Sequence, residues 1–187
     1  MQTEKLTQSL IESERQIINK SGNLKTIHLK FLSCRQSAES WNILECLEHL
    51  NLYGDFYLPE IEAAIKNSGT KGEAEFKSGF LGNYFAKSML PKDKLNKMKT
   101  FKNKNPLNKP LDKTVIDKFT DQQLKLIELL NQSKNVSLNK TKVKTSISSL
   151  IKLKLGDTFQ FFINHINRHL KQIEKIENEI KTSSISQ

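Results

Sequence analysis

The sequence has few of the residues that mark β-rich or disulfide-rich proteins. Its 187 residues include seven glycines, four prolines, three valines and two cysteines. So few turn-forming and β-branched residues argue against a sheet protein. The two cysteines, Cys34 and Cys46, lack CxxC spacing and are too few for a disulfide framework. We therefore expect an all-α fold with free thiols in a reducing compartment.

Long hydrophobic runs are also absent. No apolar stretch approaches the roughly 20 residues of a membrane-spanning helix, and the segment from Met1 to Leu6 lacks the basic start and apolar run of a secretion signal. We expect a cytoplasmic protein with no membrane partner. Leu, Ile, Val and Phe make up 54 residues, which is enough for a core. The length predicts a single domain over residues 1–187.

Arginine is scarce although the chain is basic. The formal net charge is +10, but only three of the 30 basic residues are arginine. Because nucleic-acid recognition draws on the guanidinium fork of arginine, this composition argues against a nucleic-acid partner. Lysines concentrate in residues 87–118 and 133–156. A solvated surface is the expected role of these lysines, and attraction of an anionic substrate is the alternative.

Apolar residues recur at helical spacing in four segments, which predict the helices of a four-helix bundle. The helices are expected to begin near residue 3, to run from about 42 to 67, to span about 112–132 and to begin after residue 157. Two long connections remain, at about 69–111 and 133–154. The first is apolar enough to contain a short helix that lies over the bundle.

Individual residues indicate where these helices begin, bend or end. Asn42 and Glu45 have the spacing of a capping box at the start of the second helix. Asp157 is expected to cap the last helix. Gly22 is expected to bend or break the first helix, and Pro59 to kink the second.

Two of the four histidines lie four residues apart near the C-terminus. His165 and His169 therefore share one face of a helix. His169 continues an apolar seam of three-four spacing formed by Phe159, Phe162, Ile166, Ile173, Ile176 and Ile180. His49 flanks the corresponding seam of the second helix. Neutral imidazole is a good ligand for Zn, Fe or Ni, so the three histidines predict a metal site with open positions; the alternative is hydrogen-bonded core residues.

Two segments carry a resemblance to a known family. Ser40-Trp41-Asn42-Ile43-Leu44-Glu45, continued by His49-Leu50, and His165-x-x-x-His169-Leu-Lys-Gln172 resemble the DinB/YfiT-like superfamily of four-helix metalloproteins. The resemblance covers nearly the whole chain; one departure is Asn42, where the family commonly has serine.

The resemblance carries implications for the site and the activity. It implies that His49, His165 and His169 hold one divalent metal, Zn or Ni. It further implies a metal-dependent S-transferase using a low-molecular-weight thiol, or a metal-dependent hydrolase, that acts on a small-molecule substrate. Members of this family often pair as homodimers, so a homodimer is expected as well.

A second interpretation stays open at this point. The chain could be a non-catalytic stress-response or interaction protein with a structural or vestigial metal site, which a fourth protein ligand would favour. No catalytic acid or base is identified. Tyr53, one turn beyond His49, either packs or polarises a leaving group. His28, expected in the first helix without a histidine partner, should lie outside the site.

Overall fold

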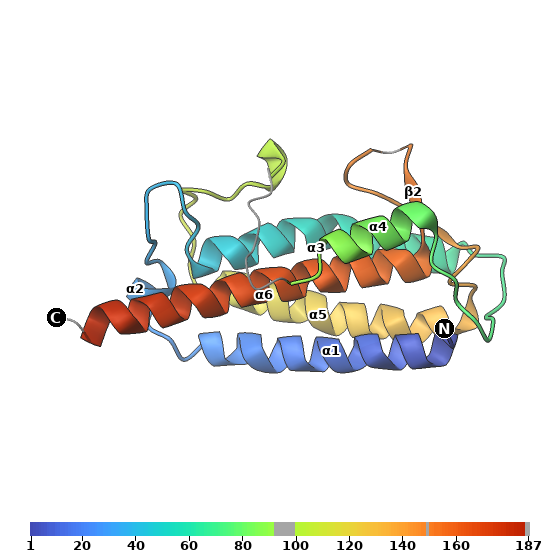
Figure 1. The fold of residues 1–187 in the computed structure, drawn as a ribbon, viewed down its shortest axis with the longest axis horizontal. Helices are drawn as coiled ribbons and strands as arrows, with labels where there is room; N and C mark the ends of the chain where they lie inside the picture. Colours follow the sequence, from blue (N-terminus) through green and yellow to red (C-terminus); the bar gives the residue numbers. More distant parts are fainter. Residues whose placement is uncertain (92–99, 149, 186–187) are drawn as a thin grey trace.

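Four long helices lie side by side in the computed structural model, which describes residues 1–91, 100–148 and 150–185 (Figure 1). They are α1 (Thr3–Leu24), α3 (Ile43–Lys66), α5 (Thr114–Gln132) and α6 (Leu155–Ile185). The shorter elements are α2 (Leu29–Leu32), α4 (Phe80–Ser88), the 3-10 helices η1 (Lys102–Lys104) and η2 (Ser133–Asn135), and the strands β1 (Lys142–Lys144) and β2 (Lys152–Lys154). The predicted all-α class is confirmed.

The bundle places α1 diagonally across from α3, because each of these two helices packs against both α5 and α6. Side-chain pairs between neighbouring helices fix their directions. The pairs Ser13–Asn167 and Lys20–Glu174 join α1 to α6, and Asp55–Lys118 and Glu62–Lys125 join α3 to α5. Within each pair of helices the residue numbers rise together, so these neighbours are parallel. The α3–α6 and α1–α5 neighbours run in opposite directions (Figure 1).

This topology explains the first long connection. Because α3 and α5 are parallel neighbours, the chain between them has to return along the length of the bundle. It does so through α4, which packs against α6, and through η1, which lies against α3. The short helix predicted here is confirmed, and residues 92–99 of this connection lie outside the described residues.

The start of α3 follows directly from its sequence. The Asn42 side chain accepts a hydrogen bond from the Glu45 backbone N–H at 2.8 Å, and the Glu45 carboxylate accepts one from the Asn42 N–H at 2.9 Å. This reciprocal capping box is the predicted one. Pro59 lies inside α3, which continues past it to Lys66. Near the middle of α3, a Cβ at Gly54 would overlap the amide end of the Gln122 side chain from α5, so glycine leaves room for this amide against α3.

One local expectation is close to the structure and another is wrong. α1 ends at Leu24, two residues after Gly22, so the first helix stops close to the expected weak point. Asp157 does not cap α6, which already begins at Leu155. Its carboxylate instead accepts hydrogen bonds from the Ser78 hydroxyl and the Gly79 N–H, and so ties the start of α4 to α6.

The second long connection folds into a small antiparallel hairpin that the sequence patterns did not predict. Val143 pairs with Leu153, and both side chains are buried. The described part of the chain contains no helix that is both long and apolar enough to traverse a bilayer.

Candidate metal centre

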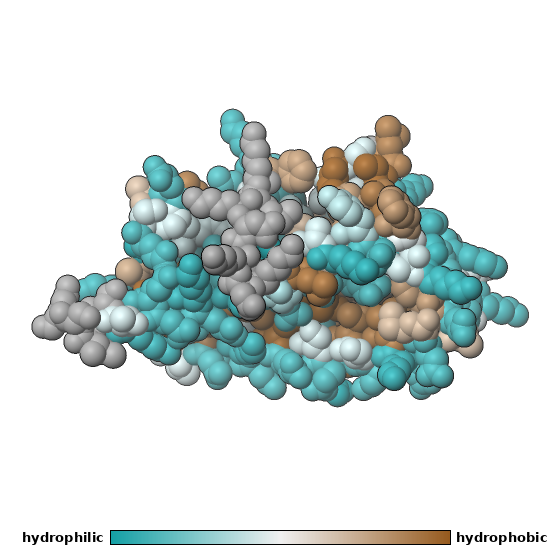
Figure 2. Space-filling model, viewed as in Figure 1, coloured by the Kyte–Doolittle hydropathy of each residue, from teal (hydrophilic) through white to brown (hydrophobic). Residues whose placement is uncertain are grey.

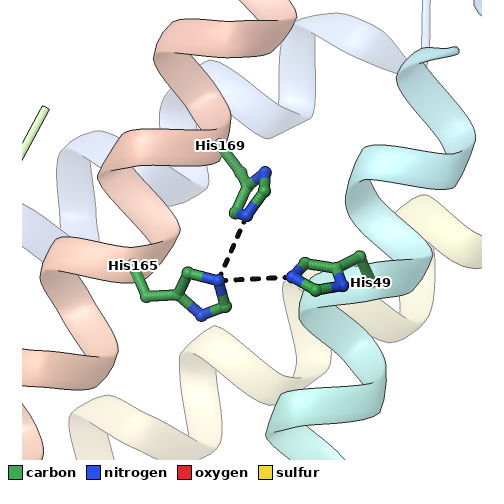
Figure 3. A group of neighbouring side chains, drawn as sticks. All are labelled: His49, His165 and His169. Atoms are coloured by element: carbon green, nitrogen blue, oxygen red, sulfur yellow. Dashed lines mark hydrogen bonds between the residues drawn. The ribbon is translucent and has the colours of Figure 1, made fainter. Parts of the chain in front are cut away.

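Three histidines from two helices meet between α3 and α6. His49 comes from α3, and His165 and His169 come from successive turns of α6 (Figure 3). The Nε2 atom of His165 lies 3.3 Å from Nε2 of His49 and 3.1 Å from Nε2 of His169. His49 and His165 are 3% and 4% exposed, and His169 is partly exposed. The structure therefore brings together all three histidines that the sequence singled out.

Two of the three rings are oriented by a hydrogen bond on the side away from the cluster. The Nδ1–H of His49 donates to the backbone carbonyl of Lys104 at 2.7 Å, and the Nδ1–H of His169 donates to Oε1 of Gln172 at 3.0 Å. Because a carbonyl oxygen can only accept, each of these rings carries its proton on Nδ1. Their Nε2 lone pairs therefore point toward His165 and toward each other, which is the arrangement that oriented metal ligands have.

Hydrogen bonds within the cluster cannot satisfy all of its nitrogens. The Nε2 atoms of His49 and His169 each direct a lone pair at Nε2 of His165, which can carry only one proton and so can donate to only one of them. The Nδ1 atom of His165 is buried without a partner among the described residues. A cation placed among the three Nε2 lone pairs resolves the conflict between these atoms, with the His165 proton then on Nδ1. These Nε2–Nε2 separations of 3.1 and 3.3 Å are close to the roughly 3.3 Å between nitrogens that each lie about 2.0–2.1 Å from a tetrahedral zinc. The residues present therefore fit a metal ion.

Burial keeps these imidazoles neutral. Desolvation lowers the pKa of His49 to about 4 and that of His169 to about 3. It lowers the pKa of His165 well below its usual range, with a further contribution from the neighbouring histidines. All three rings are thus uncharged at neutral pH, and the neutral imidazole is the form that binds metals.

Aromatic rings line the cluster. The Trp41 ring lies 4.7 Å from the His49 ring and 5.9 Å from the His169 ring, measured between centroids. The Tyr53 ring lies edge-on to His165 at 4.6 Å. Burial raises the pKa of Tyr53 to about 12, so its phenol stays protonated at neutral pH. Tyr53 thus packs a neutral phenol ring against a candidate ligand.

The segment 101–108 is fastened to the α3 side of the cluster. Besides the Lys104 carbonyl that holds His49, Asn105 accepts a hydrogen bond from the Trp41 indole N–H at 3.0 Å. The Asn108 backbone N–H donates to the buried Glu45 carboxylate at 2.6 Å. These contacts fix the backbone that orients one candidate ligand.

Sequence reasoning missed most of the groups that support the three histidines. The role of Gln172 could have been predicted from its spacing, since a residue three positions after His169 shares its helix face. Lys104 and Asn105 had none, because they lie more than fifty residues from their partners in the chain. His28 lies apart from the cluster; it caps α2 and accepts a hydrogen bond from the Lys30 N–H, whereas we expected it inside the first helix.

The geometry defines a class of protein: a helical bundle with a buried three-histidine cluster that can hold a metal ion. Among the described residues, no fourth His, Cys, Asp or Glu joins the group. The chain belongs to the DinB superfamily, whose family model matches residues 6–173. Comparisons with curated proteins and with solved structures gave no match.

Proposed function

We propose that His49, His165 and His169 bind one divalent metal, Zn or Ni, and that this centre catalyses a reaction on a small-molecule substrate. The reaction is transfer of a low-molecular-weight thiol to an electrophile, or hydrolysis. One observation carries the proposal: two rings are fixed by hydrogen bonds on Nδ1 so that their Nε2 lone pairs converge on a third buried imidazole.

The chain's own residues would keep this centre dry and oriented. Lys104 and Gln172 hold two of the rings in the tautomer that exposes Nε2. Trp41 and Tyr53 cover the cluster with aromatic surface, which limits access of water. When bound, a divalent metal supplies Lewis-acid activation, which deprotonates a water or a thiol near neutral pH. Both proposed reactions need such a nucleophile.

The number of protein ligands favours catalysis over the structural alternative. Structural zinc sites have four protein ligands, whereas catalytic sites have three and leave a position for water or substrate. The described residues supply three histidines and no further His, Cys, Asp or Glu within the group. A closed structural site would require a fourth ligand.

A paired measurement on His169→Leu tests whether the centre is catalytic. Electrophiles and ester or amide substrates are screened with the wild-type metalloprotein, with and without glutathione, mycothiol or bacillithiol. The variant restores the apolar seam of α6, so we expect it to fold and to lose all metal-dependent turnover. His28→Ala, outside the cluster, should keep the full rate. A folded His169→Leu protein that retains the wild-type rate would contradict the proposal.

A further inference from the structure

The hairpin β1–β2 carries four lysines on one face. In its register Lys142 lies opposite Lys154, and Lys144 lies opposite Lys152. Val143 and Leu153 point into the core between them, so the lysines share the outward face. Like charges directly across a strand pair destabilise it. Residues 133–156 contain no acidic residue to offset this repulsion.

Other elements neutralise this face only in part. The Lys144 ammonium lies 3.6 Å from Glu60 of α3, and the Lys154 ammonium donates to the Lys77 carbonyl at 2.6 Å. These contacts involve only Lys144 and Lys154. The other two lysines of the face, Lys142 and Lys152, are exposed to solvent. The face therefore keeps a net positive charge.

Large apolar side chains project beside these lysines. Phe80 and Tyr84, one turn apart on α4, are 94% and 64% exposed, and Leu150 in the hairpin loop is 91% exposed. The start of α4 lies against the hairpin, since Lys154 bonds to the backbone just before it. Figure 2 shows apolar side chains gathered at the upper right of the molecule, where Figure 1 places α4 and the hairpin. Almost complete exposure of a Phe and a Leu on one surface indicates an interaction site.

We propose that this surface, formed by α4 and the β1–β2 hairpin, docks onto an anionic lipid bilayer. Lysines attract the negatively charged headgroups, and projecting apolar side chains enter the boundary between headgroups and acyl chains. The hydropathy argument against a membrane partner concerns spanning helices and does not apply to a surface contact. This inference is independent of the chemistry at the histidine cluster.

Charge distinguishes the bilayer from two other occupants. A second copy bound through the same face in a two-fold dimer would bring lysines against lysines. A nucleic acid would fit the charge, but the surface contains no arginine, the residue that such interfaces prefer. Binding to an anionic lipid bilayer requires only positive charge and projecting apolar side chains, and this surface has both.

Vesicle sedimentation of the full-length protein tests the proposal. We expect binding to phosphatidylcholine vesicles that contain phosphatidylglycerol and none to pure phosphatidylcholine. Each lysine near an anionic surface contributes about fivefold to partitioning, so Lys142→Gln/Lys152→Gln should bind about 25-fold more weakly. Phe80→Ser/Leu150→Ser should also weaken binding, by about tenfold for each side chain that inserts. All four side chains are exposed, so both variants should fold as the wild type does.

Matched variants at distant exposed positions control for charge and hydropathy. Lys30→Gln/Lys181→Gln makes the same charge change on α2 and near the end of α6, and Leu29→Ser/Phe31→Ser removes exposed apolar side chains from α2; both regions lie at the opposite end of the bundle from the hairpin (Figure 1). Both should bind vesicles as the wild type does.

Four results would overturn the proposal. One is no binding to the anionic vesicles. A second is equal weakening by the control variants. A third is capture by single- or double-stranded DNA in preference to vesicles at physiological salt. The fourth is a dimer in analytical ultracentrifugation that Phe80→Ser/Leu150→Ser dissociates, which would assign the surface to a second copy.

Discussion

The metal-free protein should lose stability steeply between about pH 6 and about pH 5. The three clustered histidines are neutral when folded, because burial lowers their pKa values from 6.5, to about 4 for His49 and about 3 for His169. In the unfolded chain they take up protons near pH 6.5. Unfolding therefore binds protons in this range, so the stabilising contribution is complete above pH 6.5 and falls as the pH drops toward the folded values.

Glu14 acts in the opposite direction. It is fully buried on α1, and neither carboxylate oxygen has a partner among the described residues. Burial raises the pKa of Glu14 well above its usual range. Folding therefore favours the protonated form of Glu14, so its contribution to stability is fully present below the unfolded pKa and is lost as the pH rises through the raised folded pKa.

These opposing groups set the size of the effect. One proton exchanged on unfolding changes the free energy of unfolding by about 1.4 kcal/mol per pH unit. Proton uptake by the three histidines sets an upper limit of about 4 kcal/mol per pH unit for the loss, and proton release from Glu14 reduces it. Domains of this kind are typically stable by about 5–15 kcal/mol, so such a slope is large enough to unfold the metal-free protein in mild acid.

Urea unfolding of chelator-treated protein at several pH values measures this slope. His169→Leu removes one of the histidine protons and should reduce the slope by about 1.4 kcal/mol per pH unit, whereas Glu14→Gln removes the opposing proton and should increase the slope. A free energy of unfolding that is flat between pH 6 and pH 5 would refute the reasoning. So would an unchanged slope in His169→Leu.

Two further predictions concern side chains around the cluster and the helix contacts. Gln172→Leu removes the acceptor that fixes the His169 ring, so metal affinity measured by chelator competition should fall about 10- to 100-fold, and an unchanged affinity would contradict this role. Gly82→Ala should destabilise the fold by about 1–3 kcal/mol, because the added methyl overlaps the body of the Asp157 side chain. Gly22→Ala, with open space around it, should instead stabilise α1 by about 0.5–1 kcal/mol; equal effects of the two changes in thermal unfolding would argue against this packing.

The sequence predicted the features that depend on local spacing. The periodicity of apolar residues located the long helices, and Asn42 with Glu45 identified the start of α3. The i, i+4 spacing of His165 and His169 is sufficient by itself to place both side chains on one face of a helix. His49 was assigned to the same site because it flanks an apolar seam of the second helix and because of the family resemblance. The structure groups it with the other two histidines.

Features that depend on distant segments were missed or misplaced. Asp157 was expected to cap α6, but the Leu155 and Gly156 N–H groups already donate to the carbonyls of Thr141 and Leu138, so the helix begins earlier. The hairpin escaped notice because its strands have three residues each, too few for an alternating pattern to stand out. The Lys104 carbonyl has no sequence signature, since every residue has a carbonyl.

Metal content is the most direct test of the central claim that three histidines form one metal centre. Protein purified without added metal is analysed by inductively coupled plasma mass spectrometry for the wild type and for His49→Ala, His165→Ala, His169→Ala and His28→Ala. We expect one equivalent of a divalent metal in the wild type and in His28→Ala, and a similar large loss in each of the other three. Equal metal content in the wild type and His169→Ala would contradict the claim.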